Sequence, residues 1–210
     1  MTGTPAILVS DCPRPPVDLA QRKLPIKILD LDATPLRRIH RTVHDPVYFN
    51  KPGVSGSRFR FDAPNDEFGV LYASQSFDAC VAETIVRDQF EEGELPLQVE
   101  EAQLACRSVS TLKTTSGSLR LVDLTEPVTR LGCTAQVLSD PDYTSPNQWS
   151  QALHDHPAQV DGIYFRSRYA NQASVAIFDH VDVVRVGDPI ELLNSVEMGE
   201  YLDREEIGLV

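Results

Sequence analysis

The feature that most constrains the fold of this chain is a strand that passes directly into a helix, in residues 69–83. Residues 70–74 are rich in strand-forming side chains, and alternation places Val70 and Tyr72 on one face with Leu71 on the other. A helix is expected to follow at once. The stretch therefore predicts a strand with two distinct faces, joined to a helix by a short turn.

One side of the predicted helix carries apolar residues at helical spacing. Ser74 or Ser76 can cap its first turn. The expected buried stripe consists of Phe77, Cys80, Val81, Thr84 and Ile85. Glu83 lies off this stripe, so its carboxylate is expected beside the core rather than inside it. Because Arg87 follows at i+4, a solvated ion pair on the helix surface also explains both residues.

The composition is that of one folded domain. The chain has 210 residues, of which 41% are apolar and 15 are prolines, and this suits an α+β domain with many turns. Residues 1–30 are proline-rich and lack periodicity, so we expect an N-terminal arm there and one domain over residues 31–210. The sequence has neither the basic start and apolar core of a signal peptide nor a run of 18 apolar residues, so a cytoplasmic location is expected.

The cysteines and histidines do not have the spacing of a metal site. The four cysteines are widely separated, with no C-x-x-C pair, and at least Cys80 falls on the predicted buried stripe. The five histidines show no ligand spacing that pairs with a cysteine or carboxylate motif. We therefore expect reduced thiols and no bound metal.

The charge of the chain is negative but unevenly distributed. The net charge of −12 disfavours direct binding to a nucleic-acid backbone. Residues 1–72 carry ten Lys and Arg against eight Asp and Glu, whereas residues 179–210 carry two against nine. The basic segment could bind a small anionic ligand such as a nucleotide diphosphate. The acidic end by itself is typical of a solubilising helix.

Other segments predict further strands and two further helices. Strands are expected at residues 26–31, 35–40, 104–109, 119–124, 173–178 and 181–186, and another runs from residue 161 into a polar loop at 167–172. The first helix should end in the acidic turn at Glu91–Glu94. A second helix is expected at residues 145–154, and a third from the cap at Asp188 to Arg204.

Residues 57–61 alternate between polar and aromatic side chains, which predicts Arg58 and Arg60 on one face and Phe59 and Phe61 on the other. The glycine and serine before Arg58 let the backbone approach a bound group. An arginine here suits bidentate contact with a phosphate. An exposed strand edge decorated with arginines is the alternative.

Four segments occur in an order that resembles the RES domain, a family named for its arginine, glutamate and serine. The matching segments are Arg38-Ile39, Gly56-Ser57-Arg58-Phe59, Val70–Ser74 with Ala82-Glu83, and Asp161–Arg168 followed by Val175–Phe178. The similarity covers roughly residues 34–187 and leaves the N-terminal arm outside. Gly-Ser-Arg-Phe replaces the commoner Gly-Gly-Arg-Trp pattern of the family.

The resemblance implies a fold similar to the diphtheria-toxin-type ADP-ribosyltransferases, with central mixed or antiparallel sheets flanked by helices. It implies a bacterial toxin of a type II toxin–antitoxin system that arrests growth by degrading NAD+. The nicotinamide–ribose bond would be cleaved by phosphorolysis or hydrolysis, with inorganic phosphate as a co-substrate in the first case. The resemblance also implies an antitoxin partner of the Xre, MbcA or ParS type, whose tail blocks the active site.

The resemblance also suggests a role for each matching residue. Glu83 would bind the ribose hydroxyls and face the positive charge that develops as nicotinamide leaves. Tyr72 would stack on the cationic nicotinamide ring. Arg38 and Arg58 would hold the diphosphate or an incoming phosphate, and Ser167 would hydrogen-bond the nicotinamide ribose. Because nicotinamide leaves as a neutral molecule, this chemistry needs no metal.

Two alternatives remain open at the level of sequence. The same pocket could transfer ADP-ribose to a cellular protein. A non-catalytic partner-binding domain, in which Glu83 and Arg87 are a surface pair, belongs to a different class. The sequence contains no G-x-G-x-x-G or Walker pattern, so a conventional Rossmann or P-loop nucleotide site is not indicated.

Overall fold

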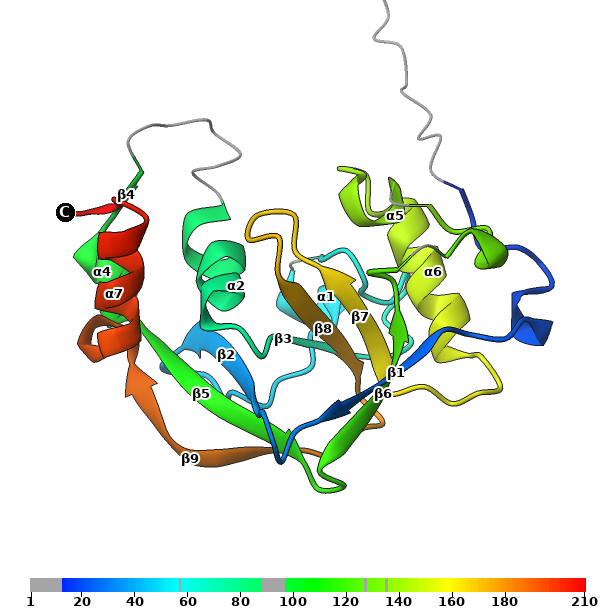
Figure 1. Ribbon diagram of the computed structural model, residues 1–210, viewed down its shortest axis with the longest axis horizontal. Coiled ribbons are helices and arrows are strands. Elements are labelled where there is room, and N and C mark those ends of the chain that lie inside the picture. Colours follow the sequence, from blue (N-terminus) through cyan, green and yellow to red (C-terminus); the bar gives the residue numbers. More distant parts are fainter. Residues whose placement is uncertain (1–12, 57, 88–96, 127, 135) are drawn as a thin grey trace, which may run out of the picture.

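Two curved β-sheets form the centre of the molecule (Figure 1). The computed structural model describes residues 13–56, 58–87, 97–126, 128–134 and 136–210. The larger sheet contains, in spatial order, β1 (Ile26–Asp30), β6 (Ser118–Asp123), β7 (Gly162–Arg166), β8 (Ala173–Phe178) and β3 (Val70–Ala73). The smaller sheet contains β2 (Leu36–Arg41), β5 (Arg107–Thr114) and β9 (Val183–Glu191). Strands β6 and β7 run parallel, and the other pairs in these sheets run antiparallel.

Helices flank both sheets (Figure 1). The larger sheet is covered by α5 (Gln136–Ser139) and α6 (Thr144–His154), and the smaller sheet by α2 (Phe77–Val81), α4 (Glu101–Ala105) and α7 (Val196–Arg204). Shorter elements are α1 (Pro52–Ser55), η1 (Leu19–Gln21), η3 (Thr129–Leu131), η4 (Leu192–Asn194), and the ribbon of β4 (Gln98–Val99) with β10 (Gly208–Leu209). The predicted α+β class, with several sheets flanked by helices, is confirmed.

Strand β3 buries both of its faces, because the larger sheet lies between two apolar layers. Val70 belongs to a core cluster that includes Trp149 of α6, whereas Leu71 belongs to a second cluster that includes Leu112 of the smaller sheet. Tyr72 packs with the first cluster and Ala73 with the second. The predicted two-faced strand is therefore confirmed, and its two faces pack against α6 on one side and the smaller sheet on the other.

The described part of the predicted N-terminal arm packs on this body. Leu19 and Leu24 are buried in the core cluster beneath α6. Strand β1 pairs with β6, and the indole Nε1 of Trp149 donates to the carbonyl of Pro13 at 2.7 Å. Residues 13–30 therefore contribute a strand and apolar side chains to the folded body.

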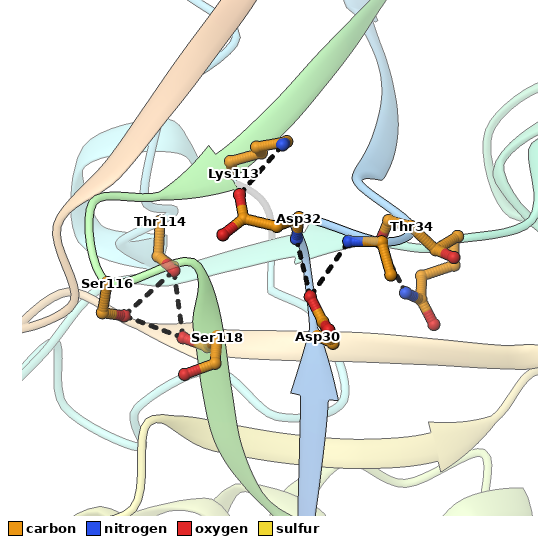
Figure 2. Close-up of polar contacts among 9 residues, drawn as sticks. Asp30, Asp32, Thr34, Lys113, Thr114, Ser116 and Ser118 are labelled. Atoms are coloured by element: carbon orange, nitrogen blue, oxygen red, sulfur yellow. Dashed lines mark hydrogen bonds and ion pairs between the residues drawn. The ribbon is translucent and has the colours of Figure 1, made fainter.

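Polar side chains hold the corner where the chain crosses from one sheet to the other (Figure 2). Asp30, at the end of β1, accepts the backbone N–H of Asp32 at 2.9 Å, and Asp32 forms an ion pair with Lys113 of β5 at 3.0 Å. The carbonyl of Thr34 accepts a hydrogen bond from the Gln75 side chain at 2.6 Å. Since Gln75 comes just before α2, this corner also positions the start of that helix.

The helix predicted from Asp188 begins later. Strand β9 continues through Asp188 and Pro189 to Glu191, and α7 starts at Val196. Because β9 is the edge strand of its sheet, the missing N–H of Pro189 is tolerated there. Residues 188–191 therefore belong to the edge strand β9, although their sequence has the pattern of a helix cap.

The strand predicted at residues 104–109 is also displaced. Leu104 lies in α4, and β5 starts at Arg107 and runs to Thr114. The predicted acidic turn at Glu91–Glu94 lies outside the described residues. Within the described ranges, no helix is both long enough and apolar enough to cross a membrane.

Candidate functional site

A cavity of about 770 Å³ lies next to α2, with walls from both sheets. Six arginines line it: Arg38, Arg41, Arg60, Arg87, Arg166 and Arg168. The acidic lining residues are Asp45 and Glu83. In a chain with a net charge of −12, this is a local concentration of positive charge that suits a small anionic ligand. The volume falls in the range of roughly 300–1,000 Å³ that is typical of small-molecule sites.

Glu83 reaches the cavity from a π-helical turn that continues α2. Ser76 caps α2 by accepting a backbone N–H from its first turn, at 3.3 Å. The π-helix η2 (Ala82–Val86) has a wider turn, which changes the direction of its side chains. Thr84 is consequently exposed and Val86 is buried, so the predicted buried stripe is wrong at Thr84.

A serine in the loop between β7 and β8 holds the carboxylate of Glu83. Ser167 Oγ donates to Glu83 Oε1 at 2.6 Å and accepts the backbone N–H groups of Tyr169 and Ala170 at 3.2 and 3.3 Å. The loop lies beside α2 in Figure 1. Because a hydroxyl has one proton, these contacts direct that proton to Glu83. Ser167 itself is buried behind the cavity wall.

Arg38 extends from β2 and organises the loop that follows this strand. Its Nη1 donates to the carbonyls of Pro46 and Tyr48, each at 2.9 Å. Burial lowers the pKa of Arg38 to about 10, so the guanidinium is still protonated at neutral pH. Strand β2 is tied to the start of α2, because the N–H of Arg37 donates to the carbonyl of Ser74 at 2.6 Å.

Tyr72 of β3 and Phe59 form an aromatic part of the cavity wall. Their ring centroids are 5.7 Å apart, with the rings inclined at 67°. The hydroxyl of Tyr72 donates to Asp62 Oδ1 at 3.0 Å and accepts the N–H of Phe61 at 2.9 Å. Burial raises the pKa of Tyr72 well above its ordinary value. Tyr72 therefore offers a neutral ring to the cavity, which Glu83 also lines.

Residues 58–61 form an irregular segment with a turn at 60–61 rather than an alternating strand, and this separates the two arginines. Arg60 lines the cavity, donates to the carbonyl of Asp140 at 2.8 Å, and lies 4.9 Å from the ring centroid of Tyr143. Arg58 instead donates to the carbonyl of Pro64 at 2.9 Å and to Oδ1 of Asn147 at 3.2 Å, and it is not among the lining residues. The predicted shared face of Arg58 and Arg60 is wrong.

Sequence reasoning also missed His40, Arg166, Arg168 and Cys80 as lining residues. The signals for Arg166 and Arg168 were their position at the start of a polar loop and within the segment Asp161–Arg168 that resembles the RES domain. Burial lowers the pKa of His40 and therefore favours its neutral imidazole. Burial raises the pKa of Cys80 to about 12, so its thiol is not a nucleophile at neutral pH.

In the part of the chain that the structure describes, no three His, Cys, Asp or Glu side chains are grouped closely enough to hold a metal ion.

The stability of the protein should depend on pH through Asp62, which is fully buried. Burial raises the pKa of this carboxyl from 3.8 to about 6. Between these values the folded protein retains a proton that the unfolded chain has released, so this group lowers the free energy of unfolding as the pH rises, by up to about 1.4 kcal/mol per pH unit. Above pH 6 and below pH 3.8 the contribution is constant.

Urea unfolding of the wild type and of Asp62→Asn at pH 4–7.5 measures this dependence. The difference between their free energies of unfolding should shift in favour of the variant as the pH rises towards 6. A difference that stays the same at every pH would contradict the assignment to Asp62.

The fold and the cavity define an α+β protein with an arginine-lined site that contains the carboxylate of Glu83. The family model of the RES domain matches residues 35–196, so the chain belongs to the RES domain family and the resemblance seen in the sequence is confirmed. No curated protein matches the chain significantly. A chain in the crystal structure of the M. tuberculosis MbcT–MbcA toxin–antitoxin complex has a similar fold, with a TM-score of 0.55 and 16% identity over 91% of this chain and 98% of that chain.

Proposed function

We propose that this chain is a toxin of a toxin–antitoxin system that cleaves the nicotinamide–ribose bond of NAD+. The observation that carries the proposal is the carboxylate of Glu83, which Ser167 holds at 2.6 Å, in a cavity whose lining includes six arginines and the rings of Tyr72 and Phe59. Membership of the RES domain family and the fold shared with a chain of a toxin–antitoxin complex support the same assignment.

The charges of NAD+ match those of the cavity. Its diphosphate carries two negative charges, which Arg38 and Arg60 would bind through their guanidinium groups. Its nicotinamide ring is cationic and would lie on the aromatic wall of Tyr72 and Phe59. Glu83 would then contact the ribose that joins these two groups. The cavity thus offers a partner of suitable charge for each part of the substrate.

In the proposed reaction, the bond between ribose C1′ and nicotinamide nitrogen breaks, and its electron pair goes to that nitrogen. Nicotinamide leaves as a neutral molecule, and Glu83 stabilises the positive charge that develops on the ribose. An oxygen of inorganic phosphate then bonds to C1′ and gives ADP-ribose 1″-phosphate. If water attacks instead, it loses a proton and the product is ADP-ribose.

We also propose that the chain has the diphtheria-toxin-type fold. It would act in the cytoplasm, where an Xre-like antitoxin would bind it. Two sheets flanked by helices, with a carboxylate-bearing helix beside a cavity, suit this fold. A cavity with six arginines would also accept an antitoxin tail that ends in a carboxylate. The antitoxin part of the proposal can be tested in cells that express the chain alone or together with a helix-turn-helix protein encoded by a neighbouring gene. Growth should stop in the first case and recover in the second.

Incubating the protein with NAD+, with and without phosphate, and measuring the product masses tests the activity. ADP-ribose 1″-phosphate supports phosphorolysis, and free ADP-ribose supports hydrolysis. Labelled ADP-ribose attached to a protein would favour the transferase instead. If NAD+ persists in both conditions and Glu83→Gln still inhibits growth, the catalytic proposal fails and a partner-binding role remains.

Replacing Arg60 with glutamine should raise the KM for NAD+ by about 10- to 100-fold, because one charge-assisted hydrogen bond contributes about 1.5–3 kcal/mol. Arg58→Gln is the matched control, since the guanidinium of Arg58 bonds to protein groups outside the cavity wall. Steady-state kinetics on both variants, with thermal unfolding to verify folding, measure the difference. A larger rise in KM for Arg58→Gln than for Arg60→Gln would contradict the assignment.

A further inference from the structure

Asp62 is a buried carboxylate that the proposed chemistry does not use. Its side chain is fully inaccessible to solvent. It accepts hydrogen bonds from the Tyr72 hydroxyl at 3.0 Å, the backbone N–H of Phe59 at 2.6 Å and the Asn50 side chain at 2.7 Å. A buried carboxylate costs free energy unless such donors surround it. Asp62 therefore joins three segments that each contribute to the cavity wall.

Both aromatic rings of the wall depend on this carboxylate. The N–H of Phe59 bonds to Asp62 Oδ2, which fixes the backbone that carries the Phe59 ring. Because the Tyr72 hydroxyl already accepts the N–H of Phe61, its single proton is committed to Asp62 Oδ1. The rings of Tyr72 and Phe59 meet edge-on, with their centroids 5.7 Å apart, and the same carboxylate thus holds both residues.

We propose that Asp62 is a positioning residue, which aligns the rings of Tyr72 and Phe59 for the nicotinamide end of the ligand. Asp62 itself does not touch the ligand, because it lies behind the wall. This inference rests on the proposed function for the identity of the ligand. The alignment of the two rings is a property of the protein alone and can be tested without substrate.

The protonation of Asp62 should change this alignment. Protonation removes the negative charge that strengthens these three hydrogen bonds and adds an O–H donor to the carboxyl group, so it should weaken the hold of Asp62 on Tyr72 and Phe59. The titratable and charged groups that act on Asp62 are Tyr72 of β3 and Arg58, which lies four residues earlier in the chain. Burial holds the pKa of Asp62 at about 6, so the network should rearrange within the pH range in which the enzyme can be assayed.

The first experiment measures Tyr72 directly by NMR of protein labelled with ¹³C at the tyrosine Cζ, with the Tyr72 signal identified by its loss in Tyr72→Phe. In the wild type, this signal should shift between pH 5 and 7. The shift should be absent in Asp62→Asn and unchanged in Asp66→Asn, a matched carboxylate that accepts the backbone N–H of Gly53 outside the cavity. A Tyr72 signal that does not titrate in the wild type overturns the proposal, even if Asp62→Asn does not fold.

The second experiment separates this inference from the proposed function. With NAD+ as the probe, Asp62→Asn should raise KM about tenfold at pH 7.5 and change kcat less, because the rings bind the substrate rather than break its bond. The wild-type KM should rise below pH 6 with the same midpoint as the NMR shift. An unchanged KM in folded Asp62→Asn overturns the positioning role. A wild type that consumes no NAD+ overturns the proposed function, while the NMR titration still decides the role of Asp62.

Discussion

Replacing Glu83 with glutamine is expected to reduce kcat for NAD+ cleavage by about 10²–10³-fold, the usual cost of removing one group that stabilises transition-state charge. The glutamine side chain has the same size, and its amide oxygen can still accept the hydrogen bond from Ser167 Oγ. The substitution therefore removes mainly the negative charge, which is needed only when the ribose becomes cationic. The KM for NAD+ should change much less than kcat.

Quantifying nicotinamide release in single-turnover experiments tests this prediction at the chemical step. Glu101→Gln is the matched control, because Glu101 is an exposed glutamate of α4 outside the cavity lining. Equal activity of Glu83→Gln and the wild type would exclude Glu83 from the chemistry.

Ser167→Ala should reduce kcat by about 10- to 100-fold, since it removes a hydrogen bond to a charged group that is worth about 1.5–3 kcal/mol.

Replacing Trp149 with alanine is expected to lower the free energy of unfolding by about 3–5 kcal/mol. Trp149 is fully buried and is the largest side chain in the core cluster between α6 and the larger sheet. Its removal leaves a cavity that the surrounding strands cannot fill. A loss of this size is a large part of the total stability of a typical domain, about 5–15 kcal/mol.

The comparison with Trp149→Phe separates packing from hydrogen bonding. Phenylalanine keeps most of the apolar contact but loses the indole N–H that donates to the carbonyl of Pro13. That carbonyl also accepts the hydroxyl of Ser145 at 2.9 Å, so it is not left unsatisfied. Trp149→Phe should therefore cost less than Trp149→Ala. Because Trp149 is the only tryptophan, the urea titration should be followed by circular dichroism, and equal losses in both variants would contradict the packing argument.

Local patterns were good predictors where neighbouring residues decide the structure. The alternation in β3, the cap at Ser76 and the helix expected at residues 145–154, observed as α6, all depend on the residues of one element and their period. Prediction failed at Asp188 and Pro189, where a helix-capping pattern lies in an edge strand. There, pairing of β9 with β5 on both sides of these residues, at Val186 and Ile190, outweighs the local preference.

The sequence by itself determined the family, the strand–helix unit that carries Tyr72 and Glu83, and the identity of most candidate residues. Only the tertiary structure decided which of them meet. Ser167 holds Glu83 across 84 positions of the chain, Arg60 rather than Arg58 lines the cavity, and Asp62 links the aromatic wall. The physical reason is that periodicity describes which face of an element a residue occupies. Contacts between distant segments depend on how turns, the π-helix and the two sheets are packed together.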